Sequence, residues 1–269
     1  MKLATLRDGS RDGRLAIIDR TLARGVDASA VAATMQAALD GWDTVSPRLR
    51  QLSDDLDRGK APDAFAFDPA ALMAPLPRCY GFIDSSVYLN HMELARALRG
   101  ATLPETYRRE PLISLRLPAP FLGPCADAIL PDGDVGLDME AEVAVILDDV
   151  PPGSGLAEAE SHIRLVTLVN DTSYRTVLAR ELGEGRAAYL GKGAPSMAPV
   201  AVTPDELGSD WRNGMLARPI EVRVNGELLG KPNAAVDASF TFPDIIRHAC
   251  RYRGLCAGTV IAAGTVSNR

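Results

Sequence analysis

The sequence contains few cysteines, and their spacing excludes the usual structural roles of this residue. Cys79, Cys125, Cys250 and Cys256 are the four cysteines among 269 residues. They form no C-x-x-C pair and have no partner histidines at the spacing of a zinc site. We therefore expect reduced thiols, in the core or at the surface of a cytoplasmic protein.

The sequence also lacks a long basic run, and its formal net charge is −6 with a pI near 5.2. This balance excludes the electrostatic footprint of a protein that binds nucleic acid or an anionic membrane. No apolar run approaches the length of a membrane span, and the first residues lack the apolar stretch of a signal peptide. We expect neither export nor membrane insertion, which leaves small-molecule chemistry as the default function.

The first part of the chain has the pattern of a small α+β unit. Two short apolar runs, 3–6 and 15–18, flank Asp-Gly turn dipeptides and predict a β-hairpin. From Asp27 the pattern becomes helical, and Ser46-Pro47 favours the start of a second helix.

The prolines between residues 69 and 77 predict a connection after this unit, because proline interrupts helices and central strands. We place the boundary at Pro75. The expected organisation is a small N-terminal domain over residues 1–74 and a larger domain over residues 75–269.

The stretch 137–147 predicts a β-strand that begins with two acids, Glu140 and Glu142. Because side chains alternate faces along a strand, the two carboxylates lie on the same side. In one interpretation both acids are in water and the alternate residues face the core: Met139, Ala141 and Val143. In the other, a cation lies between the carboxylates. This stretch alone favours the first interpretation.

Asp84 and His91 follow a short apolar run and belong to a helical pattern that reaches Gly100. Helix capping accounts for Asp84, and a solvent-facing position accounts for His91. On a continuous helix, however, their separation is two turns, which places both side chains on one face roughly 10 Å apart. That distance is too wide for one shared metal but suits a metal ligand and a base on either side of a substrate.

Asp171 follows the near-continuous apolar run 163–169, which predicts a strand buried on both faces. It then opens a helix predicted to end at Gly183, with Arg175 one turn further along. A helix N-cap with a surface ion pair accounts for Asp171 and Arg175 when they are considered alone.

Lys192 lies between two glycines, as in part of a phosphate-binding loop. The similarity is weak, because the G-x-x-x-x-G-K-[ST] spacing is absent and no helix directly follows. His162 and His248 have no acidic or cysteine neighbours at ligand spacing, and we interpret both as structural.

Four carboxylates thus stand at the ends of predicted elements: Asp84, Glu140, Glu142 and Asp171. Three further polar residues have similar positions: His91, Arg175 and Lys192. A ligand set made entirely of oxygen suits a hard cation, Mg²⁺, Mn²⁺ or Ca²⁺, rather than zinc.

The order and spacing of these residues resemble those of the fumarylacetoacetate hydrolase family. The family pattern has an Asp with a His seven residues later, a D-[MF]-E-x-E, an N-D-x-[ST]-x-R, a G-K-x-x-x-[TS] and a final G-T. These motifs stand here, in the same order, at Asp84 to His91, Asp138 to Glu142, Asn170 to Arg175, Gly191-Lys192 to Ser196, and Gly264-Thr265. The resemblance covers residues 78–269, and it extends weakly to the opening residues, which are similar to those of bacterial two-domain members.

The resemblance implies an α+β fold: a mixed β-sheet roll or barrel with a small N-terminal domain, usually as a homodimer. It assigns the divalent metal to four residues: Asp84, Glu140, Glu142 and Asp171. His91 would be the base, and Arg175 and Lys192 would meet the substrate's carboxylate and oxyanions. Three further residues would line the site: Ser196, Gly264 and Thr265.

The implied activity is hydrolysis of a C–C bond in a diketo or acylpyruvate-type 2-oxo acid, as in aromatic catabolism. Such a reaction needs an activated water, a stabilised tetrahedral intermediate and a held enolate. A histidine, cationic side chains and a divalent metal can supply these.

Three positions depart from the family pattern among the substrate-binding residues. Ser86 and Phe121 stand where the fumarylacetoacetate-cleaving members of the family have tyrosines, and Leu178 stands where those enzymes have a glutamine. We therefore expect a smaller acylpyruvate or a related 2-oxo acid. The family also continues beyond the final G-T to a glutamate that orients the histidine, whereas this chain stops at Arg269. We expect either a fragment or a protein that lacks this part.

Two alternatives stay open. Relatives on the same scaffold decarboxylate, hydrate, dehydrate or isomerise 2-oxo acids, and the motifs do not separate these reactions. A protein of another class, a catalytically disabled metal-binding or assembly protein, is favoured by the absent C-terminal segment and the altered tyrosine positions.

Overall fold

The computed structural model describes residues 1–98, 100–117 and 120–267. Two of the sequence features therefore lie outside the described residues. One is Arg99, within the helical pattern expected to reach Gly100, and the other is the chain end at Asn268-Arg269.

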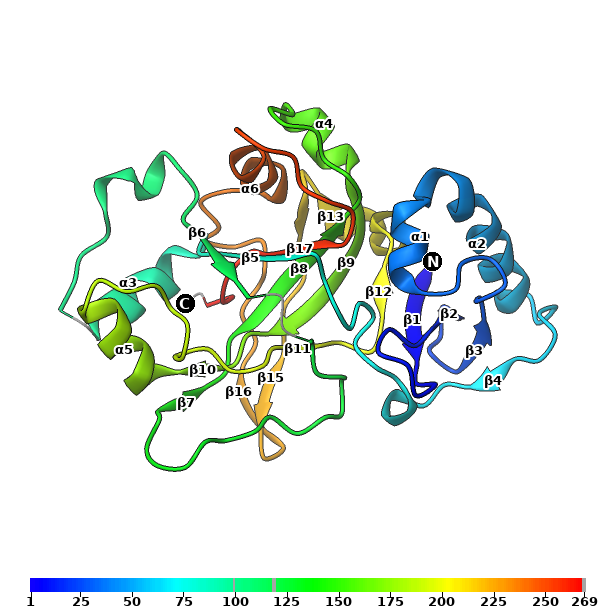
Figure 1. Cartoon of the computed structure of the whole chain (residues 1–269), viewed down its shortest axis with the longest axis horizontal. Helices are drawn as coiled ribbons and strands as arrows, with labels where there is room; N and C mark the ends of the chain where they lie inside the picture. Colours follow the sequence, from blue (N-terminus) through cyan, green and yellow to red (C-terminus); the bar gives the residue numbers. More distant parts are fainter. Residues whose placement is uncertain (99, 118–119, 268–269) are drawn as a thin grey trace.

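Within these residues, eleven strands form one mixed sheet that extends across the molecule (Figure 1). Ten of them lie in the order β4-β3-β2-β1-β12-β9-β8-β17-β5-β6, and β11 also pairs with β9. Their bounds are β1 Lys2–Leu6, β2 Arg14–Ile18, β3 Arg24–Asp27, β4 Phe65–Ala66, β5 Gly81–Ser85, β6 Ile113–Arg116, β8 Ala141–Leu147, β9 Ile163–Asn170, β11 Ser196–Met197, β12 Ala201–Val202 and β17 Thr259–Ala262. In the described part of this sheet β17 and β5 are parallel, whereas the other pairs are antiparallel. The expected α+β class with a large mixed sheet is confirmed.

The N-terminal unit combines β1 to β4 with helices α1 (Met35–Asp40) and α2 (Trp42–Asp57). The predicted hairpin is present as the antiparallel pair β1–β2. Both helices differ from the prediction. Asp27 ends β3, and residues 28–34 form turns and irregular structure, so α1 begins only after the Thr34 cap. Helix α2 begins at Trp42, whose buried side chain holds the first turn on the core, and Pro47 lies inside it.

The sheet continues from this unit into the rest of the chain, because Lys2 in β1 lies opposite Val202 in β12. The boundary at Pro75 stays a prediction.

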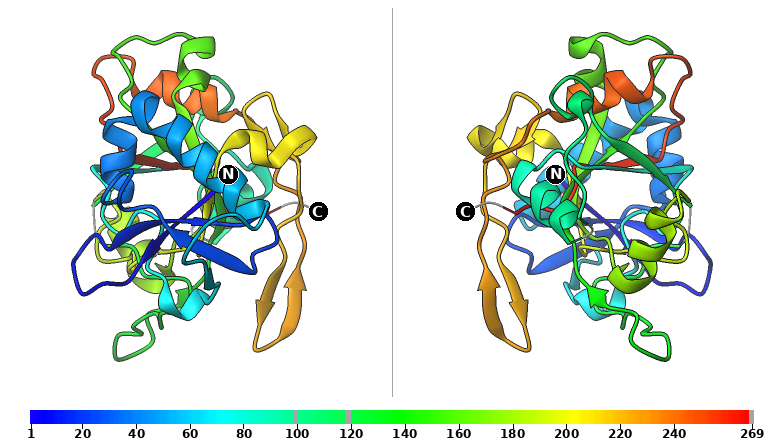
Figure 2. Two further views of the ribbon diagram at one scale, coloured as in Figure 1. Left: turned by 90° about the vertical axis from the view of Figure 1, so that its right-hand side faces the viewer. Right: turned by 90° about the vertical axis from the view of Figure 1, so that its left-hand side faces the viewer.

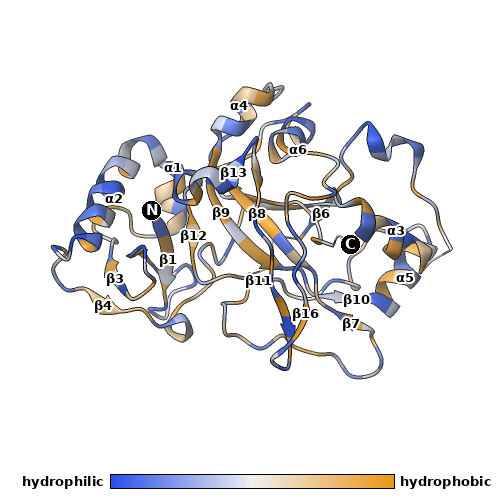
Figure 3. Ribbon diagram, turned by 180° about the vertical axis from the view of Figure 1, so that it is seen from behind, coloured by the Kyte–Doolittle hydropathy of each residue, from blue (hydrophilic) through white to orange (hydrophobic). Residues whose placement is uncertain are grey.

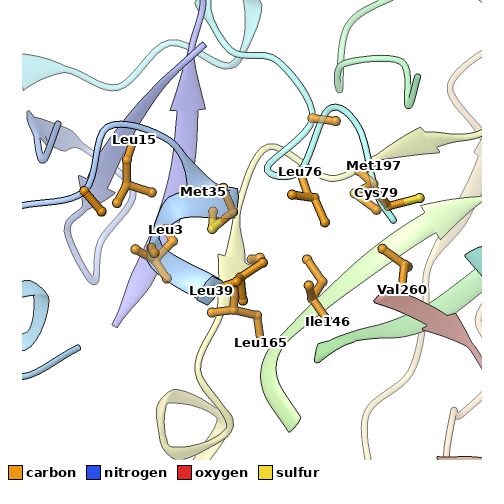
Figure 4. Close-up of a cluster of buried hydrophobic side chains, with 14 of the residues drawn as sticks. Leu3, Leu15, Met35, Leu39, Leu76, Cys79, Ile146, Leu165, Met197 and Val260 are labelled. Carbon is orange, nitrogen blue, oxygen red and sulfur yellow. The ribbon is translucent and has the colours of Figure 1, made fainter. Parts of the chain in front are cut away.

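One face of the sheet is hydrophobic along its middle. Val260 lies opposite both Phe82 and Ile146 in neighbouring strands, so the three side chains share this face. They belong to a buried cluster that also contains Leu3, Met35 and Leu39 of the N-terminal unit. Figure 4 shows this cluster joining the N-terminal hairpin and α1 to the central strands.

The opposite face packs against two helices, α4 (Leu156–Ser161) and α6 (Phe242–Ala249). Ile83, Val145 and Ile261 come from alternate strand positions and pack on this side. Helix α6 starts at a capping box between Thr241 and Asp244. Both faces of the central strands are thus covered, and Figure 3 shows hydrophobic residues concentrated along β8 and β9.

Smaller elements complete the described fold. Two-stranded pairs join β7 (Leu137–Asp138) to β10 (Ser173–Tyr174), β13 (Trp211–Arg212) to β14 (Met215–Leu216), and β15 (Val222–Val224) to β16 (Glu227–Gly230). Figure 2 shows the β15–β16 hairpin projecting from the body of the molecule. The remaining helices are α3 (Leu89–Ala97), α5 (Arg175–Gly183) and the 3-10 helices Pro69–Ala71, Glu105–Arg108 and Pro204–Asp210. Among the described residues, no helix combines the length and apolar character that crossing a membrane requires.

Candidate active site

The hydrophobic face of the sheet becomes acidic at one end. Asp84 lies opposite Ala262 in β17, and Ala262 lies opposite Ala144 in β8. Glu142 precedes Ala144 by two residues, so it shares the face of Asp84. Asp171 directly follows β9, whose Val169 lies opposite Glu142. The sheet register therefore brings Asp84, Glu142 and Asp171 together from three strands.

These three carboxylates form a compact buried group. Each offers an oxygen within 4.8 Å of the oxygens of the other two, and each residue is less than a tenth exposed. The interpretation of the Glu140–Glu142 stretch as a solvated strand face is wrong, because both glutamates are buried. Asp84 is also not a helix cap, since it lies within β5, and Asp171 is separated from α5 by β10.

The pKa values of Asp84 and Glu142 reflect burial and repulsion by neighbouring carboxylates. Burial raises the pKa of Asp84 to about 7, and the nearby Asp171 adds to the rise while Arg116 opposes it. Burial also raises the pKa of Glu142 well above its usual range, with further increases from Asp84 and Asp171. Three negative charges are thus unfavourable here unless a cation compensates them.

Arg116 at the end of β6 supplies part of this compensation, and the sequence interpretation did not include it. Its Nη2 donates to Asp84 Oδ2 at 2.5 Å and to Asp171 Oδ2 at 2.6 Å. The residue is 7% exposed, which is unusual for an arginine. The available signal was a single charge at the end of the short run Ile113 to Leu115.

Glu140 lies beside this group and is held by two other cations. Arg175 Nη2 donates to Glu140 Oε1 at 2.5 Å, and Lys192 Nζ donates to Glu140 Oε2 at 2.5 Å. Burial acts to raise the pKa of Glu140, but Lys192 and Arg175 outweigh it and lower that pKa to about 2. Lys192 also reaches Asp171 Oδ2 at 2.7 Å, so it joins Glu140 to the three-carboxylate group.

The backbone around Lys192 explains its two flanking glycines. Lys192 forms an antiparallel bridge with Ser173, and Gly193 donates to the Thr172 carbonyl. A Cβ on Gly191 would lie 2.6 Å from Leu178 Cα, and one on Gly193 would lie 2.8 Å from the Tyr174 hydroxyl. The glycines therefore permit close packing against α5 and β10, which differs from the role of glycines in a phosphate-binding loop.

His91 is near these residues but comes from a different element than expected. Asp84 lies on β5 and His91 lies on α3, so no continuous helix joins them and the separation of roughly 10 Å, which assumed such a helix, does not apply. The His91 Nε2 lies 3.9 Å from Glu140 Oε1. Burial lowers the pKa of His91, and although Glu140 acts in the opposite direction, Arg175 and Lys192 add to the decrease.

Two adjoining cavities give access to the site. A cavity of about 290 Å³ is lined by residues of the cluster together with Ser86, Leu178, Gly264 and Thr265. A second, of about 510 Å³, shares His91, Arg175 and Thr265 with the first and extends to β16. Residues of α3 and α5 line the first cavity, and Figure 1 shows these two helices near each other at one end of the sheet.

Two of the expected substrate-binding residues lie outside these two cavities. Phe121 is buried in the hydrophobic core, where its ring meets Phe82 edge to face at 5.1 Å between centroids. Ser196 pairs with Asn170 in the sheet and lines a neighbouring cavity of about 340 Å³, which also contains Glu142. The roles predicted for both residues in substrate binding stay predictions.

A divalent cation fits the donor set of Asp84, Glu142 and Asp171. The Oε2 of Glu142 is buried and has no hydrogen-bond partner among the described residues. A buried carboxylate oxygen without a partner is costly, and a hard cation among carboxylates removes that cost. When all four acids are ionised, their charge exceeds that of the three cations beside them: Asp84, Glu140, Glu142 and Asp171 against Arg116, Arg175 and Lys192.

Comparison with known families gives two matches along the chain. Residues 1–78 match the family described as fumarylacetoacetase N-terminal domain 2, and residues 85–269 match fumarylacetoacetate (FAA) hydrolase C-terminal. An uncharacterised protein of Pyrococcus horikoshii is 30% identical over 182 residues, which are 65% of this chain and 73% of that protein. An oxaloacetate tautomerase of Bacillus subtilis is 31% identical over 134 residues, which are 49% of this chain and 41% of the tautomerase.

Among solved structures, a maleylpyruvate hydrolase from Sphingobium sp. SYK-6, in complex with manganese(II) and pyruvate, shares the fold with a TM-score of 0.71. The sequences are 19% identical, and the match covers 98% of this chain and 88% of the hydrolase. This likeness confirms the expected fold of the whole described chain.

Proposed function

Because this chain belongs to the fumarylacetoacetate hydrolase family, we propose that it is a divalent-metal-dependent enzyme that cleaves a C–C bond of a small acylpyruvate or related diketo 2-oxo acid with water. The family contains hydrolases and also tautomerases and isomerases. The reaction and the substrate class are therefore the proposal, and the residues of the site support it as follows.

The observation that carries the proposal is the unpartnered Glu142 Oε2 within a buried carboxylate group that adjoins a cavity. Asp84, Glu142 and Asp171 would hold the cation, and Glu140 would remain beside it in its pairing with Lys192 and Arg175. When bound, Mg²⁺, Mn²⁺ or Ca²⁺ supplies positive charge that stabilises an enolate oxygen.

His91 is the residue that moves protons in this proposal. Its lowered pKa keeps the imidazole neutral near pH 7, so Nε2 is able to accept a proton from a water molecule in the cavity. The hydroxyl of that water adds to the acyl carbon, the C–C bond breaks, and its electron pair forms the enolate of the 2-oxo acid. The proton held on His91 then goes to the enolate carbon, which returns the imidazole to its neutral form.

Arg175 and Lys192 would bind the anionic end of the substrate. Both already pair with Glu140 at 2.5 Å, and both line the cavity that contains His91. A guanidinium and an ammonium directed at one position suit a carboxylate next to a keto oxygen. These two cations favour a 2-oxo acid over a neutral diketone.

The lining of the cavity favours a small substrate. Leu178 contributes an apolar wall and Ser86 a short polar one, at positions where the resemblance led us to expect longer polar side chains. These side chains offer fewer polar contacts to a second carboxylate, so the lining suits an acylpyruvate better than the longer fumarylacetoacetate.

Keto–enol tautomerisation of a 2-oxo acid is the second candidate, since the Bacillus subtilis relative is an oxaloacetate tautomerase. The same groups would serve this reaction, because it also requires stabilisation of an enolate and transfer of one proton. No C–C bond breaks in it, so analysis of the products separates the two candidates.

The test follows the enol absorbance of a panel of acylpyruvates, with Mn²⁺ present, together with the amount of pyruvate formed. We expect the absorbance to fall with equal amounts of pyruvate and carboxylic acid, and His91→Asn to slow the reaction at least about 100-fold. Loss of absorbance without pyruvate would favour tautomerisation. Inactivity across the panel in a protein that binds Mn²⁺ would favour a metal-binding or assembly protein.

The homodimer also stays a proposal, which light scattering in solution would test.

A further inference from the structure

Glu181 on α5 is a buried carboxylate whose charge is stabilised by backbone N–H groups. It is 2% exposed, and its oxygens accept hydrogen bonds from three successive backbone N–H groups. Tyr189 and Gly191 donate to Oε2 at 3.0 and 2.9 Å, and Leu190 donates to Oε1 at 2.9 Å. Among the described residues, no lysine or arginine forms an ion pair with Glu181.

The three donors form a turn that is otherwise poorly supported. Tyr189 and Leu190 are more than half exposed, and the segment 182–187 that leads to them is exposed as well. An exposed turn of this kind is ordinarily mobile, because few buried contacts oppose its local opening. Three hydrogen bonds to one buried anion provide the missing support, and charge-assisted bonds of this type are stronger than neutral ones.

The turn leads directly into Lys192. After Gly191 the chain forms its bridge to β10, and the Gly191 carbonyl accepts a hydrogen bond from Tyr174. The Lys192 ammonium then reaches Glu140 and Asp171 at 2.5 and 2.7 Å. A displacement of the turn would therefore move the Lys192 ammonium relative to both carboxylates.

We propose that Glu181 is a positioning residue that fixes the turn 189–191 and thereby places the Lys192 ammonium between Glu140 and Asp171. A role of the Lys192 ammonium in catalysis rests on the function proposed above, whereas its position between Glu140 and Asp171 does not depend on that function. Burial alone would raise the pKa of Glu181, but the N–H groups of Leu190, Gly191 and Tyr189 lower it, so the carboxylate is ionised at neutral pH.

Helix α5 would position two of the cationic side chains of the site. Arg175 is its first residue and binds Glu140 directly, while Glu181 lies further along and acts on Lys192 through the turn. Because a helix is a rigid element, the two cations that meet at Glu140 would keep a fixed separation. This arrangement suits recognition of one small anionic group in the cavity.

The test measures the chemical reactivity of Lys192 and needs neither metal nor substrate. The chain contains four lysines, and Lys60 and Lys231 are exposed and serve as internal references. Trace labelling with acetic anhydride, followed by peptide mass spectrometry, would compare the wild type with Glu181→Gln, which keeps the shape but removes the charge and one acceptor oxygen. We expect labelling of Lys192 to become about tenfold faster relative to the references, together with faster hydrogen exchange at residues 189–191.

Glu184→Gln is the matched control, since Glu184 follows the same helix, is exposed and pairs only with Arg186 among the described residues. The control should leave both measurements unchanged. Unchanged labelling and exchange in a folded Glu181→Gln protein would overturn the proposal, because packing alone would then hold the turn. If the acylpyruvate assay fails while the labelling result holds, only the proposed function is contradicted.

Discussion

Arg116 and Asp84 lie on the neighbouring strands β6 and β5, and the arginine Nη2 donates to Asp84 Oδ2 at 2.5 Å. The same nitrogen reaches Asp171, so one guanidinium bridges two of the three carboxylates proposed to bind the cation. Glu142 receives no such partner from a cation among the described residues. This asymmetry leaves Glu142 as the carboxylate whose charge the proposed metal would compensate.

Replacing this arginine should destabilise the metal-free protein most strongly. In Arg116→Met, Asp84 and Asp171 lose a buried partner, which costs about 3–5 kcal/mol when no metal is bound. Added Mn²⁺ should restore a large part of this loss, because it supplies positive charge to the same carboxylates. Urea unfolding in EDTA gives the unfolding free energy of the metal-free protein, and urea unfolding in Mn²⁺ gives that of the metal-bound protein.

Arg218→Met is the control. It breaks an exposed pair with Asp210 and should lower the unfolding free energy by less than about 1 kcal/mol in both conditions. Equal losses for Arg116→Met with and without metal would contradict this view.

Gly264 is expected to tolerate no side chain. Its φ is 99°, and a Cβ there would lie 2.4 Å from the Ser85 carbonyl oxygen, at the end of the strand that carries Asp84. Gly264→Ala should therefore cost at least about 3 kcal/mol of unfolding free energy and weaken Mn²⁺ binding.

Gly133→Ala is the control that measures the cost of a positive φ without a close contact of the added Cβ. Gly133 has a φ of 90° but nothing within 4 Å of its added Cβ, so its substitution carries only the backbone strain, about 1 kcal/mol. Similar losses for the two variants, measured by urea unfolding, would show that the approach to Ser85 is unimportant.

Phe121 should behave as a core residue. Phe121→Ala removes a ring that packs against Phe82, and it should lower the unfolding free energy by about 3–5 kcal/mol. If the protein hydrolyses an acylpyruvate, its KM should be unchanged in this variant. Ser86→Ala, at the wall of the cavity, should show the opposite pattern, with a changed KM and little loss of stability. An altered KM in Phe121→Ala would restore Phe121 to the substrate site.

The N-terminal hairpin was predictable from a local signal, the Asp-Gly turns between two apolar runs. The large mixed sheet and the joint role of the acids were instead implied by the resemblance to the family, because each acid considered alone favoured a solvated or capping position. The identity of the elements around the site was harder to predict. Asp84 has the position of a helix cap in sequence, yet the pairing of β5 with β17 and β6 places it inside a strand.

Arg116 and Glu181 escaped sequence interpretation for a physical reason. Both are charged residues near the ends of short elements, where a solvated position is the usual outcome. Their partners are Asp171 for Arg116 and the backbone of residues 189–191 for Glu181. The first of these pairings depends on sheet register, and the second depends on the path of an exposed turn. Neither leaves a periodic pattern in the sequence.

The central claim, that the buried acids hold a divalent cation, is tested most directly by titrating the metal-free protein with Mn²⁺ in a calorimeter. Wild type should bind one Mn²⁺ for each chain. Glu142→Gln, which removes the charge of the carboxylate with the unpartnered oxygen, should bind at least about tenfold more weakly and yet be no less stable without metal. The exposed Glu184→Gln should bind as wild type does. A wild-type protein that takes up no Mn²⁺, or a Glu142→Gln variant with wild-type affinity, would contradict the account.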